Sequence, residues 1–292
     1  MRLRWPITAA VLAVAVVAAC LSAAPGTPSA QAGGDFAILC AALAASASCA
    51  FAARCRRADA RAWSILALAT LLWAAGQSVW TYYGLARNHD YPFPSLADAG
   101  FLGYAVPAAI ALFSFPRPAA SRVTLMRTVL DAAVISGAVL FISWDTVLGP
   151  MFKSWRQGVL GQLTGLGYPI VDVVVTSLVL VLAMRRIPGE RLPWLFLGGG
   201  LLTLTFTDSV YAKLTFDGVT GVTGTPLAAG WVAAFLLIAL APLAPMGPGR
   251  RPTGGPTRWP WNCCRTSPAW APSSCPLSSP ARAPTPSSCS TG

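Results

Sequence analysis

The sequence predicts an all-α fold, a polytopic bundle of about eight transmembrane helices with a disordered C-terminal tail. Three observations predict it. Hydrophobic residues make up 55% of the 292 residues and charged residues 11%, against roughly 25% charged in an average soluble domain. The apolar residues form about eight runs long enough to cross a hydrocarbon layer of roughly 30 Å. Short groups of arginines separate these runs. The predicted spans are 5–24, 35–53, 62–84, 97–115, 128–148, 168–184, 193–212 and 227–246.

The first span has two interpretations. MRLR followed by an apolar run predicts an uncleaved helix, and this is the preferred assignment. The same pattern followed by SAQA at 29–32 also fits a secretory signal, and VAAC at 17–20 resembles a lipoprotein cleavage box. Residues 1–34 are therefore a first helix or signal segment with its linker, and 35–248 form the polytopic domain. Cleavage would leave the orientation of the other spans unchanged.

The distribution of basic residues predicts the orientation of the spans. Lys and Arg concentrate on the cytoplasmic side of membrane helices. With the N-terminus inside, fourteen of them fall in cytoplasmic segments and four on the other side. Both termini are therefore predicted to be cytoplasmic in a multi-pass protein of the cell membrane. The net charge of +11 follows this pattern and does not gather on one face, so nucleic acid is not an expected partner.

The fourth and fifth spans begin with helix-capping patterns. In SLAD, Ser95 is followed three residues later by Asp98 and then by an apolar run, which predicts a capping box. The Asp98 carboxylate then lies in the first turn, where the positive end of the helix dipole stabilises it. TVLD repeats the pattern with Thr128 and Asp131. These four residues are predicted to be helix caps.

Three other acids do not fit a capping role. Asp145 and Asp208 lie in the C-terminal parts of their spans, where the dipole disfavours a carboxylate. Asp172 lies about a turn inside the sixth span. An ionisable residue inside a span costs about 2.5–3.5 kcal/mol on insertion scales, so it normally faces a partner or a wet cavity. All three are predicted on the outer side of the membrane, and they are candidate ligand-binding residues.

Polar and aromatic neighbours extend these candidates. The residues in each of three sets share one helical face: Trp73, Gln77 and Trp80; Asp172 and Thr176; Thr205, Asp208 and Tyr211. We expect Asp145, Asp172 and Asp208 to line one outward-facing pocket with Trp80 and Tyr211. Two alternatives remain open. The acids can instead form hydrogen bonds between helices, and the aromatic residues can form an interfacial belt.

Several motifs that would indicate soluble chemistry are absent or misplaced. Cysteines at no metal-ligand spacing and a single histidine, His89, make zinc and haem sites unexpected, and no cofactor is expected. GGDF at 33–36 lacks the glutamate of a cyclase signature and leads into an apolar helix. GGG at 198–200 lies inside a span, where it favours close helix packing over phosphate binding. No enzymatic activity is expected from this chain.

The C-terminal tail, 249–292, differs in composition from the rest of the chain. It contains no Asp, Glu, Lys, Val, Ile, Phe or Tyr, so it cannot build a core. Abundant Pro and Ser predict disorder. Ala, Pro, Arg, Ser, Thr, Cys and Trp are also the residues that a GC-rich coding sequence gives when it is read out of frame. A frameshift near position 250 is the preferred hypothesis.

The order of several segments resembles a known family. RAW is followed by PSLADAGFLGYAVP, RTVLDAAVISGAV, YPIVDVVVTSLVLVLA and TDSVY, and then by a tryptophan that opens the last span. Over residues 60–245 this order resembles the membrane-spanning N-terminal region of actinobacterial cyclic-di-GMP signalling proteins. In that family PAS, GGDEF and EAL domains follow the last helix, and the membrane region is taken to be a sensory input. Neither a GGDEF nor an EAL motif occurs here, which supports the frameshift hypothesis.

The resemblance implies a membrane signal-input region without its catalytic domains. The main alternative is a secondary transporter, which also places acids near helix breaks. A membrane enzyme acting on lipids is the weakest alternative, because polar residues are scarce. The expected partners are the lipid bilayer, a small-molecule ligand from the outer side, and a second copy of the chain in a homodimer.

Overall fold

The computed structural model describes residues 3–56, 59–87, 91–115, 122–143, 149, 158–184, 191–216, 219 and 221–244. These residues lie in the first of two compact units, Met1–Pro256. Asp145 and the predicted tail at 249–292 fall outside the described residues.

The described residues form α-helices and short 3₁₀ turns with no strand among them, which confirms the predicted all-α class. α4 and α5 together make one span, Leu96–Ser114, so the α-helices correspond to the eight predicted spans. Six spans in the described part of the chain are long and apolar enough to cross a membrane. The elements are α1 Arg4–Ala23, α2 Pro28–Cys55, α3 Ala60–Ala86, α4 Leu96–Gly103, α5 Ala105–Ser114, α6 Arg122–Ser143, α8 Val159–Met184, α9 Arg191–Phe216, η4 Val222–Gly224, α10 Ala228–Leu240 and η5 Ala241–Leu243.

Three helices begin earlier than the apolar pattern predicts. α2 begins at Pro28, where Thr27 caps it by accepting a hydrogen bond from the Ala30 N–H, and α8 begins at Val159. α6 begins at Arg122. Thr128 and Asp131 therefore lie inside α6, and the prediction that they cap it is wrong. The reason is that Leu, Met and Arg in the preceding RVTLMR segment are good helix formers, so the helix extends beyond its apolar part.

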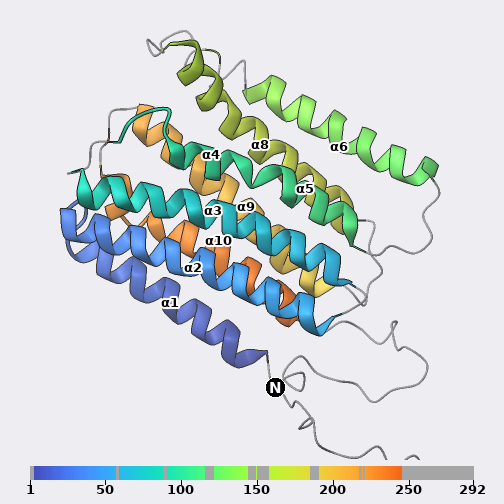
Figure 1. Cartoon of the computed structure of the whole chain (residues 1–292), viewed down its shortest axis with the longest axis horizontal. Coiled ribbons are helices and arrows are strands. Elements are labelled where there is room, and N and C mark those ends of the chain that lie inside the picture. The colour runs from blue at the N-terminus through green and yellow to red at the C-terminus, as the bar shows by residue number, and fades with distance from the viewer. Residues whose placement is uncertain are drawn as a thin grey trace, which may run out of the picture. The chain divides into compact units, whose positions relative to one another are not determined.

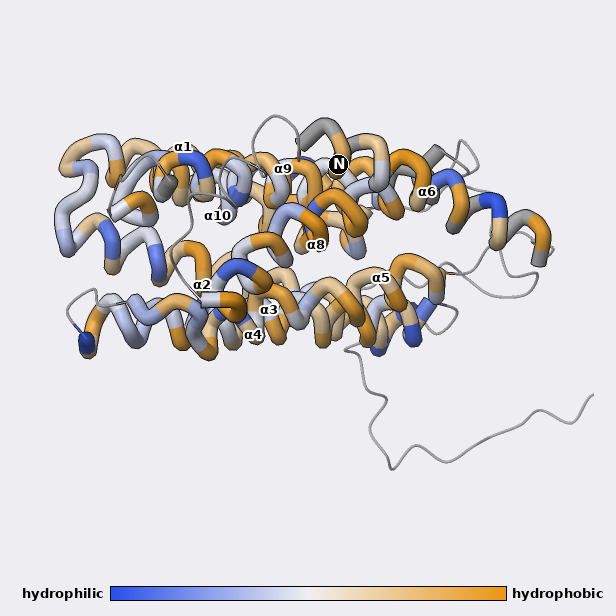
Figure 2. Tube along the Cα trace, turned by 90° about the horizontal axis from the view of Figure 1, so that it is seen from above, coloured by the Kyte–Doolittle hydropathy of each residue, from blue (hydrophilic) through white to orange (hydrophobic). Residues whose placement is uncertain are grey.

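The helices pack in two groups that share long contacts. α3 packs along α2, α4 and α5, while α10 packs against α1, α2 and α9. Figure 2 shows α2, α3, α4 and α5 on one side and α1, α9 and α10 on the other. α8 contacts α5 and α9, and α6 packs against α8 at the edge of the bundle (Figure 1). The two groups are therefore joined by the packing of α2 against α10 and, at the edge, by α8 between α5 and α9.

Glycines allow two of these helix pairs to approach closely. A Cβ added to Gly100 on α4 would lie 2.6 Å from the backbone N and Cα of Gly76 on α3. A Cβ added to Gly200 on α9 would lie 2.8 Å from the carbonyl oxygen of Ala234 on α10. The GGG segment thus contributes close helix packing, as its sequence indicates. Small residues at such crossings are typical of helices that associate in a membrane.

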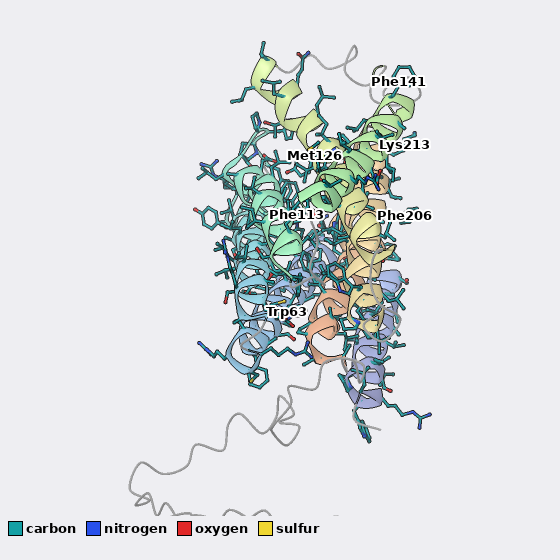
Figure 3. The ribbon with its side chains drawn as sticks, turned by 90° about the vertical axis from the view of Figure 1, so that its right-hand side faces the viewer. Trp63, Phe113, Met126, Phe141, Phe206 and Lys213 are labelled. Carbon is teal, nitrogen blue, oxygen red and sulfur yellow. The ribbon has the colours of Figure 1, made fainter. Side chains whose placement is uncertain are left out.

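Large apolar side chains cover the outside of the bundle. Phe141 on α6 is 75% exposed and Phe206 on α9 is 69% exposed, and both point away from the helices around them (Figure 3). Val106 and Leu195 are exposed in the same way. Exposed apolar side chains of this size and number are rare in soluble monomers. They form the surface that a helix bundle presents to lipid, so the chain is a membrane protein.

Candidate functional site

Polar and aromatic side chains from α2, α3, α4, α8, α9 and α10 converge near one end of the bundle. We call this the distal end; α3 finishes there at Ala86 and α4 begins at Leu96. The opposite, proximal end is where α2 finishes at Cys55 and α3 begins at Ala60. The distal cluster consists of Asp35, Gln77, Trp80, Tyr91, Asp98, Tyr104, Tyr168, Asp172, Asp208, Tyr211, Thr223 and Trp231.

Asp98 both caps α4 and joins it to α8. Its carboxylate accepts hydrogen bonds from the Ser95 backbone N–H at 2.6 Å and from the Ser95 hydroxyl at 3.0 Å. The capping box that the sequence predicts for Ser95 and Asp98 is present. The other carboxylate oxygen, Oδ1, accepts a hydrogen bond from the hydroxyl of Tyr168. The capping acid is therefore also a contact between two helices.

Asp208 on α9 is bonded to α10. Its Oδ1 accepts a hydrogen bond of 2.7 Å from the indole Nε1–H of Trp231. Tyr211, one turn further along α9, packs edge-on against the same indole, with ring centroids 5.6 Å apart. A neighbouring contact joins α8 and α9, where the hydroxyls of Thr176 and Thr205 are 2.9 Å apart. The polar faces predicted for these two spans therefore meet.

Asp35 on α2 is a member of the cluster that the sequence did not single out. It is 1% exposed and accepts a hydrogen bond from the side chain of Thr223 in η4. The side-chain amide of Gln77 donates a long hydrogen bond of 3.5 Å to the same carboxylate. α2 begins at Pro28, so Asp35 lies seven residues, or about 10 Å, inside the helix. The signal that could have identified it is the rule that intramembrane acids are functional candidates.

Asp172 on α8 differs from the other three carboxylates. It is 4% exposed, yet among the described residues no group hydrogen-bonds to it. It interacts electrostatically with Asp208 and with the buried Tyr104. Within the described part of the chain, Trp63 Nε1 is the fully enclosed side-chain polar atom that lacks a partner.

Aromatic rings form a continuous series across the cluster. Tyr91 stacks on Trp80 with ring centroids 4.2 Å apart, and Tyr211 lies edge-on to Trp80 at 6.5 Å. Trp231 continues the series through its contact with Tyr211. Tyr91 precedes α4 and lies outside the spans. Its burial, with smaller contributions from Asp35 and Tyr211, raises the pKa of its phenol to about 12.

The chemistry of the cluster is defined by four carboxylates and neutral donors. The donors to Asp35, Asp98 and Asp208 in the described residues are hydroxyl, amide, backbone and indole groups. Within the same residues, no group of three or more His, Cys, Asp or Glu is placed to hold a metal ion. The cluster can accept hydrogen bonds and attract positive charge. In the described residues it has no nucleophile and base paired for covalent catalysis.

The predicted pocket residues are brought together only in part. Asp172 and Asp208 interact with each other, and Trp80 and Tyr211 are in ring contact. Asp145 lies outside the described residues. Ligand binding by these residues stays a prediction.

The proximal end contains a smaller cluster built around Arg56. Its Nη2 donates a hydrogen bond of 3.0 Å to the carbonyl oxygen of Ala244, just after η5, and its guanidinium lies 5.9 Å from the ring centroid of Trp63. Burial lowers the pKa of the guanidinium, and Asp59 opposes that effect. Phe115 packs edge-on against both Trp63 and Trp194. The end of α2 is thus bonded to the chain that leaves α10.

Comparison of the chain with protein-family models, with curated proteins and with solved structures found no match.

Proposed function

We propose that this chain is the signal-input region of a membrane signalling protein, in which the distal cluster receives a small molecule from the outer side of the membrane. Both termini lie in the cytoplasm in this proposal, because that orientation puts most of the arginines inside. The distal cluster then faces outward, and Ala244 lies at the cytoplasmic end of the bundle. The resemblance to the input regions of cyclic-di-GMP signalling proteins supports the same assignment.

The observation that carries the proposal is a connection from the distal cluster to the proximal end. α2 contributes Asp35 at one end and Arg56 at the other. α10 contributes Trp231 to the cluster, and Ala244 lies just beyond its far end. The two helices are also bonded near the proximal end, where the Ser48 hydroxyl donates to the Ala239 carbonyl at 2.7 Å. A ligand that shifts α2 against α10 would act directly on the Arg56 contact with Ala244.

The proposal assigns no enzymatic activity to this chain. Phosphoryl transfer needs metal-held phosphates and positioned polar groups. The charged groups of the distal cluster are carboxylates, which repel phosphate, and in the described residues no group of three or more His, Cys, Asp or Glu is placed to hold a metal ion. We therefore expect that the purified chain neither makes nor hydrolyses cyclic-di-GMP.

The proposal can be tested by restoring an output. The chain is joined after Ala244 to an active GGDEF domain, and cyclic-di-GMP is measured in cells. We expect Asp172→Asn and Asp208→Asn to change the cyclic-di-GMP level while membrane insertion stays intact. Asp131→Asn, an exposed acid on α6, is the matched control. An output that is the same for all three variants and the parent would contradict the proposal.

A secondary transporter is the second candidate, and one observation favours it. α8 carries Pro169 inside the helix, between Tyr168 and Asp172. Pro107 in α5 lies one turn from Tyr104. Proline removes a backbone hydrogen bond and can bend a helix, and transporters use helix breaks near buried acids to form their binding sites. Uptake of a labelled ligand into vesicles containing the chain alone would favour this candidate over signal input.

A further inference from the structure

We infer that the distal cluster binds an organic cation, with an ammonium group held between the Asp172 carboxylate and the aromatic rings of Trp80 and Tyr211. This inference rests on the proposed function and names the class of ligand.

The first observation is the state of Asp172. A carboxylate that is 4% exposed and accepts no hydrogen bond from the described residues lacks the partner that buried charges require. Tyr104 and Asp208 are the groups that interact with it electrostatically. A positively charged group placed there would satisfy Asp172 and reduce its repulsion with Asp208. A cation at this position would supply the missing partner.

The second observation is the excess of negative groups around one ring. Tyr211 lies within electrostatic range of Asp35, Asp98 and Asp208. The described donors to these carboxylates are all neutral. Neutral donors stabilise a carboxylate but leave its charge in place. A cluster of this composition attracts one or more positive charges from solution.

The third observation concerns the kind of cation. Trp80, Tyr91, Tyr211 and Trp231 form a connected set of rings. The faces of Trp and Tyr attract ammonium groups, and sites built from several such rings recognise quaternary ammonium ligands. A divalent metal ion would instead need several oxygen ligands at short distance, and in the described residues no group of three or more acids, histidines or cysteines is placed to supply them. The combination favours an alkylated ammonium group over an inorganic ion.

Binding can be measured with the full chain purified in detergent. The probe is choline chloride, and its control is 3,3-dimethylbutan-1-ol, which has the same shape without the charge. Sodium chloride keeps the ionic strength equal in both series. We expect choline to raise the melting temperature in a saturable way, because a ligand that binds only the folded state stabilises it. We expect the neutral analogue to have no such effect.

Variants test whether the response comes from the distal cluster. Asp172→Asn should weaken choline binding by at least about tenfold, since an interaction with a charged partner is lost. Trp80→Leu should weaken it as well. The controls are Asp131→Asn and Phe141→Leu, which change an exposed acid and an exposed ring on α6. Neither control should alter the choline response.

The possible outcomes separate this inference from the proposed function. Equal effects of choline and its neutral analogue, or an unchanged affinity in both Asp172→Asn and Trp80→Leu, would overturn the cation site. If lower pH stabilises the chain and choline does not, the acids of the cluster bind protons and no organic cation, and this result would also overturn the cation site. If the fusion protein responds to Asp172→Asn but choline does not bind, signal input stands and the ligand class fails. If choline binds but the fusion output never changes, the cation site stands and signal input fails.

Discussion

Substitution of Gly100 by alanine tests the close contact that positions the distal cluster. The added Cβ would lie 2.6 Å from the Gly76 Cα and 2.7 Å from the Leu72 carbonyl oxygen. Carbon atoms in optimal contact are about 3.5–4.0 Å apart, so α3 and α4 must separate by about 1 Å. The opposing atoms are backbone and cannot move aside as a side chain does. We expect an overpacking cost of about 1–3 kcal/mol in the free energy of unfolding.

Gly103 supplies a matched control on the same helix. A Cβ added there meets nothing within 4 Å. Replacing a helical glycine by alanine otherwise gains about 0.5–1 kcal/mol, and this gain is shared by both variants. Gly103→Ala should therefore be more stable than Gly100→Ala by about the whole overpacking cost of 1–3 kcal/mol.

The measurement is thermal unfolding of the two variants and the parent in one detergent. The expected order of melting temperature is Gly103→Ala at or above the parent and Gly100→Ala below it. Gly100→Ala should also weaken choline stabilisation, because separation of α3 from α4 moves Trp80 away from the α8 side of the cluster. If the two variants melt together, the close approach of α3 and α4 does not hold the distal cluster in place.

Three further predictions follow from single contacts. Tyr168→Phe removes the hydroxyl that donates to Asp98, so it should lower the free energy of unfolding by about 1–3 kcal/mol. The control is Tyr82→Phe, at a ring that is 58% exposed, which should leave the free energy of unfolding unchanged. Equal effects of the two substitutions would refute the contact between Tyr168 and Asp98. The pKa of Tyr91 is raised to about 12 in the folded chain, so as the pH rises the unfolded chain loses the phenol proton before the folded chain does. The free energy of unfolding should therefore fall from about pH 10 to pH 12. Tyr91→Phe should reduce that fall, which melting curves recorded across this pH range measure. Reporter fusions after Arg57, Arg117 and Arg186 should all give cytoplasmic signals, and a periplasmic signal at any one would reverse the orientation.

The apolar spans were predictable because length and hydrophobicity alone define a membrane helix. Helix ends were less predictable where polar residues continue a helix beyond its apolar part. α6 shows this most clearly: its first turns run through Arg122 to Arg127, so TVLD falls inside the helix. A capping pattern predicts a helix start only where the preceding chain cannot be helical. Pro92 and Pro94 provide that condition before Ser95, and the capping box is present there.

Asp35 was missed for a related reason. The pattern GGDF at 33–36 drew attention as a fragment of a catalytic signature, and the span was expected to begin at 35. A carboxylate at the start of a helix is stabilised by the helix itself and needs no partner from another helix, whereas a carboxylate seven residues inside the helix does. The start of α2 at Pro28 changes Asp35 from the first kind to the second, and Thr223 and Gln77 supply its partners.

The convergence of the cluster could not be read from the sequence, because periodicity shows which residues share a face but not which faces meet. Asp98 illustrates the difference. Its contact with Ser95 is local, three residues apart, and a pattern can predict it. Its contact with Tyr168 joins residues 70 positions apart and depends on how closely α8 approaches α4, where a Cβ added to Gly167 would lie 3.2 Å from the Leu102 side chain. The packing of α8 against α4 therefore decides whether this capping acid stays at the surface of the bundle or becomes part of the site.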